Sequence, residues 1–356
     1  MIRRATLSLV AVLLLGLGST PAAHGDPAPP AGITISGVDS HDGMIYQHDG
    51  TLYWVGTKYS CGFVWQQPAT PWCGFGVWTA PTLAGPWAFV RPLFDPAGTS
   101  GTWKGESWQT ICRGDGCFNP RMIRRPDGVW VLWFNAPRDL RVWGGNQFWA
   151  MGCAGPAGPC GWGAGPNGST IKPSLWVCNA GGDFSLLTEG VAAWLYCGAE
   201  NAGHTISVEK LQPWWADGTG IGARNLAGLS YVEGAGVYRE PGGQIVLTFG
   251  DNCPFCSGTD TSYAVAASPP GPFQTSAGSP NRRQISAHSC GGQPRTVITI
   301  DGQAYQQIDT WYDQPSETAA ATRLEPLTFT GAPWLGPVNG QPWVGPLKPF
   351  TCGSGS

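Results

Sequence analysis

Three acidic residues occupy equivalent places in the sequence, each at the start of a short apolar segment. They are Asp42, Asp183 and Glu233, and each is followed by an apolar strand pattern, a glycine-containing turn and a second apolar strand pattern. Two carboxyl groups roughly 6.5 to 9.5 Å apart can hydrolyse a glycosidic bond with inversion, because one activates a water molecule while the other protonates the leaving oxygen. A third carboxylate nearby raises the pKa of the acid by like-charge repulsion and keeps it protonated near neutral pH.

Each of these acids also has a simpler interpretation as a turn residue. Aspartate is common in turns because its side chain hydrogen-bonds to nearby backbone amides. The shared order of the three acids, each with matching strands behind it, favours the catalytic interpretation. Asp39 is an alternative to Asp42, because it lies three residues upstream in the same turn.

The segments that begin at these acids belong to a set of five repeats. The repeats cover residues 42–57, 119–135, 183–198, 233–250 and 293–311, and their starts lie 50 to 77 residues apart. Short alternating segments bounded by Gly, Asp and Pro recur, without an amphipathic helix pattern of useful length. Such repeats are typical of β-propellers with loop insertions. We therefore predict an all-β fold, a single five-bladed β-propeller over residues 33–356, in which the repeats begin near the axis on one face.

The first 25 residues have the features of a secretory signal peptide. Arg3 and Arg4 precede an apolar stretch over 7–17 and small residues around Ala22, and a proline-rich linker covers 26–32. The apolar stretch is shorter than the roughly 20 residues that a membrane-spanning helix needs. We therefore expect a secreted, extracellular protein without membrane insertion. The two arginines would also suit twin-arginine export, although ordinary signal peptides carry basic residues in the same place.

The composition argues against a highly charged partner. Charged residues make up 12% of the chain, the net charge is -3, and no basic run occurs. Nucleic acids and anionic membranes bind clustered Lys and Arg, so neither is an expected partner. The 19 tryptophans in a weakly charged chain suit stacking on sugar rings better.

The cysteines predict a disulfide-stapled fold. All twelve follow the leader, and an even number in an exported chain indicates disulfides. The spacing suggests five close pairs: Cys61 with Cys73, Cys112 with Cys117, Cys153 with Cys160, Cys178 with Cys197, and Cys253 with Cys256. The two cysteines that remain, Cys290 and Cys352, would then form a sixth pair that ties the last blade. The Cys253-Pro-Phe-Cys256 segment also matches a redox motif, but it lacks the βαβ setting that such a motif has.

With these residues the chain resembles glycoside hydrolase family 43, and more closely its exo-1,3-β-galactanase-like branch. Asp42 precedes Leu52-Tyr53-Trp54 as the family's first-blade aspartate precedes an aromatic strand. Asp183-Phe-Ser-Leu-Leu is similar to the family's Asp-Pro-Ser-Leu-Phe, and Glu233-Gly-Ala to its Glu-Gly-Pro or Glu-Ala-Pro. The resemblance implies that Asp42 is the general base, that Glu233 is the general acid, and that Asp183 tunes the pKa of the acid and orients it.

The other two repeats also resemble that branch, with one departure. Gln293 and Asp309 match a Ser-Gln and a Met-Gly-Asp-Arg-Trp motif, which implies that Gln293 contacts substrate or the attacking water and that Asp309 is a supporting acid. Phe118-Asn119-Pro-Arg121 stands where the branch has Glu-Arg-Pro-Lys, so an expected substrate-binding carboxylate is absent. Asn119 is then expected to take over a hydroxyl contact, with Arg121 beneath it.

Histidines and tryptophans supply further candidates. His41 is a candidate substrate contact, and His41 or His288 could hold a structural ion such as Ca²⁺ or Na⁺, or a water, on the propeller axis, although a single histidine is more often a hydrogen-bonded wall residue. No organic cofactor is expected. Candidate sugar-stacking residues are Trp54, Trp65, Trp108, Trp149, Trp214 and Trp215, most of which would pack between blades in a propeller.

Together these features predict a secreted inverting glycosidase acting on an arabinose- or galactose-containing polysaccharide. A non-catalytic carbohydrate-binding propeller is the main alternative, and a propeller scaffold for protein interactions is a third. The sugar, the linkage and the exo or endo mode would depend on the loops between blades, especially 103–117 and 144–169. The sequence pattern carries no information on the oligomeric state.

Overall fold

The computed structural model describes most of the chain after the leader. The described residues are 31–99, 102, 105–142, 144–165, 171–252, 259–274, 283–311, 317–330, 334–338, 341–343 and 345–352. The predicted signal peptide, linker residues 26–30, Cys253 and Cys256 lie outside them. Residues from Ala31 onward cluster as one compact unit.

Five four-stranded antiparallel sheets form the described fold, and we number them as blades one to five by their innermost strands. Blade one contains β2 (His41–His48), β3 (Thr51–Thr57), β4 (Phe75–Ala80) and β5 (Ala88–Pro92). Blade two contains β6 (Phe118–Arg124), β7 (Trp130–Asn135), β8 (Phe148–Cys153) and β9 (Cys160–Trp162). Blade three contains β10 (Phe184–Glu189), β11 (Ala192–Ala199), β12 (Thr205–Leu211) and β13 (Gly218–Ala223).

Blades four and five complete the ring. Blade four contains β14 (Val232–Arg239), β15 (Ile245–Asp251), β16 (Thr261–Ala266) and β17 (Arg283–Ser286). Blade five contains β18 (Gln293–Ile300), β19 (Gln303–Thr310), β20 (Ala321–Pro326) and, as its outer strand, β1 (Ile33–Ile35). A small hairpin of β21 (Trp334–Val338) and β22 (Gln341–Trp343) and the short helices α1 (Trp108–Ile111) and α2 (Pro137–Val142) lie outside the blades.

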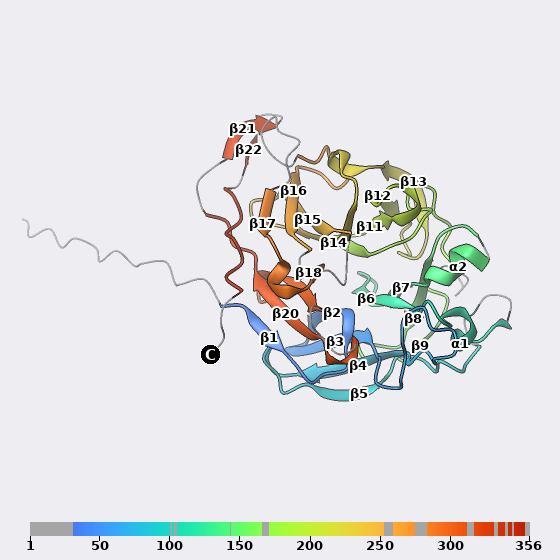
Figure 1. The fold of residues 1–356 in the computed structure, drawn as a ribbon. Coiled ribbons are helices and arrows are strands. Elements are labelled where there is room, and N and C mark those ends of the chain that lie inside the picture. The colour runs from blue at the N-terminus through green and yellow to red at the C-terminus, as the bar shows by residue number, and fades with distance from the viewer. Residues whose placement is uncertain are drawn as a thin grey trace, which may run out of the picture. The chain divides into compact units, whose positions relative to one another are not determined.

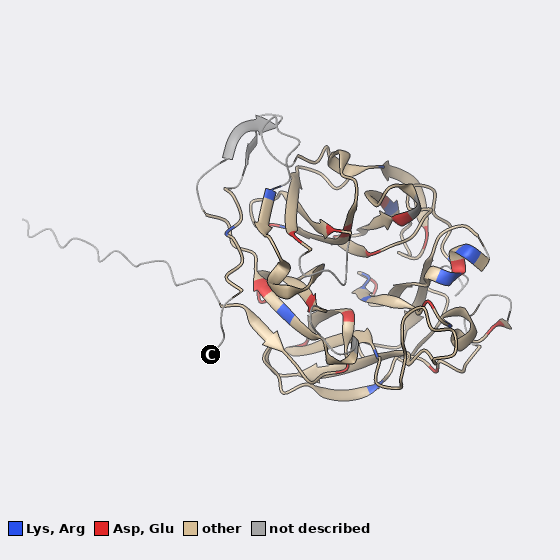
Figure 2. Ribbon diagram, in the orientation of Figure 1, with Lys and Arg blue, Asp and Glu red and all other residues tan. Residues whose placement is uncertain are grey.

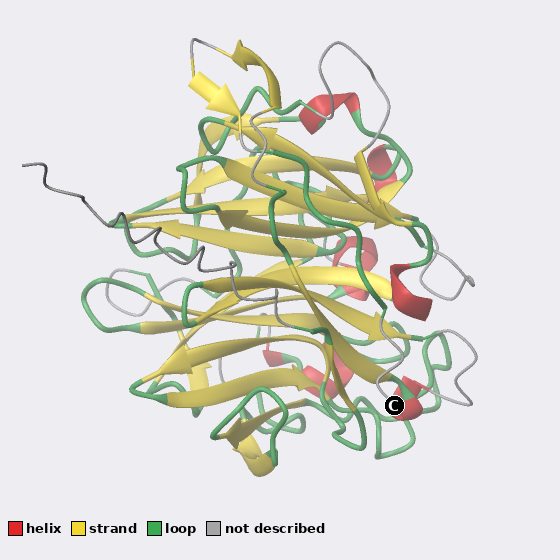
Figure 3. Ribbon diagram, turned by 90° about the vertical axis from the view of Figure 1, so that its left-hand side faces the viewer, coloured by secondary structure: helices red, strands yellow, loops and turns green. Residues whose placement is uncertain are grey.

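The ring closes through a strand from the start of the described chain. The innermost strands of successive blades contact one another, and β18 of blade five contacts β2 of blade one. β1 pairs antiparallel with β20, with Ile33 opposite Leu324. The first strand therefore fastens the last blade, and the predicted all-β five-bladed propeller is confirmed (Figures 1 and 3).

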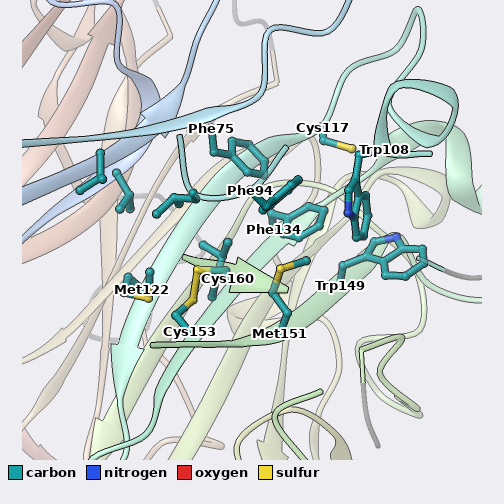
Figure 4. Close-up of a cluster of buried hydrophobic side chains, with 14 of the residues drawn as sticks. Phe75, Phe94, Trp108, Cys117, Met122, Phe134, Trp149, Met151, Cys153 and Cys160 are labelled. Carbon is teal, nitrogen blue, oxygen red and sulfur yellow. A yellow bond between two sulfur atoms is a disulfide. The ribbon is translucent and has the colours of Figure 1, made fainter. Parts of the chain in front are cut away.

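The core lies between the blades, which explains why strands such as β7 are apolar without clear alternation. All six residues of β7 are buried. Because successive side chains point to opposite faces of a sheet, a blade with neighbours on both sides buries both sets. Figure 4 shows the cluster between blades one and two, where Phe75 meets Phe134 in an edge contact of 5.1 Å between ring centres.

Five disulfides staple the described loops and hairpins, with the predicted pairing. They join Cys61 to Cys73, Cys112 to Cys117, Cys153 to Cys160, Cys178 to Cys197, and Cys290 to Cys352. Such a set is consistent with an extracellular protein, because disulfides persist in oxidising compartments. Among the described residues, no helix has the length and apolar character needed to cross a membrane.

Candidate functional site

A cavity of about 500 Å³ opens where the innermost strands begin. The first residues of all five repeats line it, so the structure brings together Asp42, Asn119, Asp183, Glu233 and Gln293. Each lies at the first or second residue of its innermost strand, or directly before it. We refer to this cavity as the pocket, and its other lining residues are Tyr59, Phe63, Trp65, Gln66, Asp115, Phe118, Asn135, Pro137, Leu140, Arg141, Gln147, Glu200, His204, Asn252, Arg295 and Trp311.

Irregular strand starts aim these side chains into the pocket. The pairing register shifts near the beginning of β2, β6, β14 and β18, as it does in a β-bulge. Asp42 and Asn119 themselves have left-handed backbone angles, with φ of 50° and 58°. Because a bulge turns a side chain away from the regular pleat, these residues can leave the blade faces and point toward the axis.

Two glycines next to the acids permit this geometry. A Cβ atom on Gly43 would lie 1.7 Å from the carbonyl oxygen of Val55, where no side chain fits. Gly234 has φ of +68°, and a Cβ there would lie 2.0 Å from the carbonyl oxygen of Pro294. The Asp42-Gly and Glu233-Gly pairs therefore have a steric cause, since only glycine lacks the Cβ that would collide.

Asp42 lies in the floor of the pocket with most of its acceptor capacity used. Its Oδ1 accepts hydrogen bonds from the Thr57 hydroxyl at 2.7 Å and from the backbone amide of Asn119 at 3.2 Å. Its Oδ2 accepts from the Tyr59 hydroxyl at 3.0 Å. Burial raises the pKa of Asp42 to about 6, and the charge of Arg295 opposes that shift only in part.

Asp39, the sequence alternative to Asp42, does not line the pocket. Its carboxylate accepts hydrogen bonds from the backbone amides of Tyr59 at 2.8 Å and Ser60 at 3.2 Å. These bonds and one with His41 lower the pKa of Asp39 to about 2, although desolvation acts in the opposite direction. Asp39 therefore holds the chain that follows β3, and the structure places Asp42 at the pocket instead.

Asp183 is held by a cation and an amide. Its Oδ2 accepts from Arg295 Nη1 and its Oδ1 from Asn119 Nδ2, both at 2.9 Å. Arg295 also contacts Asp309 Oδ2 through Nε at 3.3 Å. Because a guanidinium is always charged at ordinary pH, Arg295 forms ion pairs with both Asp183 and Asp309 and fixes the position of the Asp183 carboxyl group.

Glu233 is the opposite case, an acid in a setting that disfavours its charge. Its side chain is 15% exposed. Burial, followed by the negative charges of Asp183 and Glu200, raises the pKa of Glu233 to about 8. Its Oε2 accepts a hydrogen bond from Gln293 Nε2 at 3.0 Å, and no described residue donates to the buried Oε1 of Gln293. Near neutral pH the pocket thus contains a protonated Glu233 beside the ion pair of Asp183 with Arg295.

Several pocket residues were not predicted from the sequence. Glu200 lies at the pocket, and desolvation there with the charge of Asp183 raises its pKa to about 7. His204 places Nδ1 3.5 Å from Glu233 Oε1, and desolvation lowers the pKa of His204. Both follow blade three strand β11 in a connection without repeat pattern, so no sequence feature marked them. Arg295 stands two residues after Gln293, but the register shift between Pro294 and Val297 breaks the alternation there, so spacing alone did not mark it either.

Arg121, Asp309 and His41 lie behind the pocket wall. This agrees with the expected positions of Arg121, beneath Asn119, and of Asp309, as a supporting acid, whereas His41 was a candidate substrate contact and does not face the pocket. Arg121 is 2% exposed, and its Nη1 donates to the carbonyl oxygen of Asp42 at 2.5 Å. Asp309 is fully buried, and its Oδ2 accepts from the Asp42 amide at 2.8 Å. His41 is 1% exposed and stacks on Tyr59 with ring centres 4.9 Å apart. None of the three lines the pocket.

His288 is also remote from the pocket. It is exposed and directly precedes the short 3-10 helix Ser289–Gly291, so it does not line the axial cavity. The one group of metal-binding side-chain types found among the described residues is Cys290, Glu325 and Cys352. Its two cysteines form a disulfide, which leaves a single carboxylate as a ligand. These placements give no support to an axial ion held by His288.

Aromatic side chains form one wall of the pocket. Tyr59, Phe63 and Trp311 are buried together and line it with Phe118. Of the six tryptophans considered as stacking surfaces, Trp65 lines the pocket and is 39% exposed. Trp54, Trp108, Trp149 and Trp215 are each at most 1% exposed and pack in the core, as expected for most tryptophans in a propeller.

Several solved structures with a similar fold are glycosidases. An exo-β-1,3-galactanase from Phanerochaete chrysosporium, solved with β-1,3-galactotriose, is 16% identical with a TM-score of 0.64, over 88% of this chain and 66% of that one. One from Clostridium thermocellum is 12% identical with a TM-score of 0.62, over 86% and 61%. A GH43 β-1,3-galactosidase solved with galactodeoxynojirimycin is 17% identical with a TM-score of 0.56, over 87% and 98%.

These comparisons bear on the fold. The chain spans less than two thirds of the length of the two galactanases. No protein-family model and no curated protein matches its sequence. The predicted similarity to glycoside hydrolase family 43 is confirmed at the level of the fold.

Proposed function

We propose that the protein is a glycoside hydrolase that cleaves O-glycosidic bonds in a galactose- or arabinose-containing polysaccharide. The observation that carries the proposal is the pair of contrasting acids in one pocket: Glu233 with a pKa of about 8 and Asp42 with a pKa of about 6. Near pH 7 the first holds a proton and the second has released one, which is the division that acid–base hydrolysis requires. The galactotriose in a structure of the same fold favours galactose as the sugar.

In the proposed mechanism each carboxyl group has a separate role. Glu233 protonates the glycosidic oxygen as the bond breaks. Asp42 accepts a proton from a water that attacks the opposite face of the sugar, which inverts the anomeric centre. An ionised carboxylate has about four lone-pair positions, and three protein donors leave one of those on Asp42 for that water.

The remaining pocket residues set the charge and hold the sugar. Asp183, fixed by Arg295, keeps Glu233 protonated through its negative charge. Gln293 orients Glu233 through Nε2 and offers its Oε1 to a sugar hydroxyl or to the attacking water. Asn119 holds Asp42 through its backbone amide and Asp183 through Nδ2, and the second lone pair of its Oδ1 is the position left for a sugar hydroxyl. The proposed reaction uses no organic cofactor, and we propose secretion through the leader, in keeping with the disulfides.

The direct test is a reducing-sugar assay on galactan, arabinogalactan, arabinan and xylan. We expect sugar release from galactan or arabinogalactan, with the freshly released anomer opposite to that of the substrate by proton NMR. Retention of the anomer would contradict the inverting mechanism. Binding to these glycans without any released sugar would contradict hydrolysis and favour a carbohydrate-binding propeller.

The pH dependence of kcat/KM follows from the two shifted acids. Below a pH of about 6 Asp42 takes up a proton and loses its capacity as base, and above a pH of about 8 Glu233 loses the proton that it must donate. We therefore expect a bell-shaped profile with limbs near these values and a maximum near pH 7. The check is kcat/KM from pH 4.5 to 9.5 at constant ionic strength. A rate that keeps rising above pH 8 would exclude Glu233 as the acid.

A further inference from the structure

A second cavity of about 490 Å³ adjoins the pocket on the side of α2. It shares Gln66, Asp115 and Arg141 with the pocket, so a ligand can extend from one into the other. Its other lining residues are Pro68, Arg113, Gly114 and Arg138. We call this cavity the arginine groove.

The arginine groove is positively charged in a chain that has few charges. Three arginines line it against a single acid, Asp115, whereas charged residues are 12% of the whole chain. Two of the arginines come from α2, which carries blue segments at the right of Figure 2. Guanidinium groups stay charged at all ordinary pH and form forked hydrogen bonds with carboxylates and with phosphate-like oxyanions.

Contacts with neutral backbone groups hold two of these arginines without cancelling their charge. Arg113 Nε donates to the carbonyl oxygen of Pro68 at 2.9 Å, and Arg138 Nη1 donates to the carbonyl oxygen of Thr110. Among the described residues, none pairs with the other amino groups of either side chain. Arg141, by contrast, forms an ion pair with Asp115. Donors on Arg113 and Arg138 therefore remain for a ligand.

The walls of the arginine groove are pinned to each other. The Cys61–Cys73 disulfide closes the loop that carries Gln66, and the Cys112–Cys117 disulfide closes the loop that carries Arg113. The backbone amide of Gln66 donates to the carbonyl oxygen of Gly114 at 2.8 Å and joins the two loops. Holding the donors in place before binding lowers the ordering cost that a ligand would otherwise meet.

The charge changes sign between the arginine groove and the catalytic end of the pocket. There Asp183, Glu200 and Glu233 line the pocket, and burial together with the negative charges of Asp183 and Glu200 raises the pKa of Glu233. An anionic sugar placed beside these acids would be repelled, whereas the same group in the arginine groove would be attracted. Attraction at one site and repulsion at the other together fix which part of a chain enters which cavity.

We propose that the arginine groove binds an anionic substituent of the glycan, a sugar carboxylate or a sulfate ester, while a neutral sugar occupies the pocket beside Glu233. This inference rests on the proposed function for the identity of the ligand as a glycan. It names an acidic polysaccharide as the preferred substrate class.

Binding to a Glu233→Gln variant tests the groove without turnover. The probes are a linear β-1,3-galacto-oligosaccharide, the same chain with a glucuronic acid residue, and the same chain with a sulfate ester, each titrated by calorimetry. At low salt we expect at least one acidic chain to bind about tenfold more tightly than the neutral one. The preference should shrink at 300 mM salt, because the Debye length there is shorter than the ~10 Å that it has at 0.1 M, so salt screens the attraction between the arginines and the anion more strongly.

Substitutions locate the effect. Adding Arg113→Gln and Arg138→Gln should reduce the acidic preference from about tenfold to about one. The matched control is Arg91→Gln with Arg224→Gln, which removes the same charge at exposed positions outside both cavities and should leave the preference intact. Comparison of the glucuronic acid probe with the sulfate ester probe shows which of the two anionic groups the arginine groove prefers.

The outcomes separate this inference from the proposed hydrolysis. The protein could prefer acidic probes through Arg113 and Arg138 and yet release no sugar. That result would support anion binding in the arginine groove and would overturn the proposed hydrolysis. If no oligosaccharide binds, titrations with free glucuronate and inorganic sulfate test whether the arginine groove binds anions. We then expect one of these anions to bind, and we expect the double substitution Arg113→Gln/Arg138→Gln to abolish that binding. Equal affinity for neutral and acidic probes, or a preference that the double variant retains, overturns the proposal.

Discussion

Substituting glutamine for Glu233 is expected to slow the hydrolysis of an unactivated galactan by about 10²- to 10⁴-fold, the usual contribution of a general acid. Glutamine preserves the size of the side chain and can still accept the hydrogen bond from Gln293 Nε2. It cannot donate a proton to the departing sugar oxygen. A sugar alkoxide is a poor leaving group unless it is protonated, so the full loss of rate is expected with natural glycans.

The leaving group provides the internal control for this variant. An aryl galactoside with an acidic phenol releases that phenol as a phenolate, which needs no protonation. Glu233→Gln should therefore cleave such a substrate with a much smaller loss of rate. The matched substitution is Glu200→Gln, which removes a neighbouring carboxylate that raises the pKa of Glu233. That variant should keep most of its turnover while the alkaline limb of its pH profile moves to lower pH. Near-wild-type hydrolysis of galactan by Glu233→Gln would contradict the assignment of Glu233 as the general acid.

The stability of Glu233→Gln gives a second check. The folded pKa of Glu233 is about 8 against an ordinary value of 4.5. The folded state therefore holds a proton that the unfolded state releases, and the stability of the wild type declines from pH 4.5 until about pH 8 because of this group. Glutamine removes that dependence. We expect a Tm at least equal to that of the wild type, with a difference that grows over this range, in thermal melts at pH 5 and pH 8.

The second large effect is expected for Asp42→Asn, a loss of about 10² to 10⁴ in kcat/KM on all substrates, since base catalysis does not depend on the leaving group. Asparagine can keep the hydrogen bonds from Thr57 and Asn119 at its carbonyl oxygen, while its amide donates to the Tyr59 hydroxyl. The pocket floor should therefore stay folded. What disappears is a group that can take a proton from water.

Asp42 could instead act only as a support for the pocket floor, and the pH profile distinguishes the two roles. If Asp42 is the base, the acid limb near pH 6 disappears in Asp42→Asn, and added azide restores turnover with an inverted glycosyl azide as product. Tyr59→Phe is the matched control, because it removes one hydrogen bond to Asp42 and leaves the carboxylate in place. An unchanged acid limb in Asp42→Asn would assign Asp42 to the structure and not to the reaction.

Much of the architecture could be predicted because it is local in the sequence. Each repeat is one hairpin, and its alternation and turn residues lie within 20 residues of each other. Four of the five described disulfides were predicted in the same way, since they join cysteines at most 19 residues apart. The fifth joins Cys290 to Cys352 over 62 residues and followed from the cysteines that were left. Propeller geometry then places the five leading residues together, which made Asp42, Asn119, Asp183, Glu233 and Gln293 recognisable.

The chemical state of those residues depended on the tertiary structure. Only packing separates Asp42, buried at the pocket, from Asp39, which binds backbone amides in the next loop. Only burial and charges from other blades give Glu233 a raised pKa. Both effects arise between residues far apart in the chain.

The sequence alone thus determined the repeat count, the disulfide framework and the acids that meet, because short-range patterns encode hairpins and hairpins stack in one way around an axis. The tertiary structure decided which side chains face the cavity, and it placed the candidate substrate contact His41 behind the wall, where Arg121 and Asp309 support the acids. It also added Glu200, His204, Arg295 and the arginine groove. Bulges and inter-blade loops set these positions, and neither has a periodic pattern from which a side-chain direction can be read.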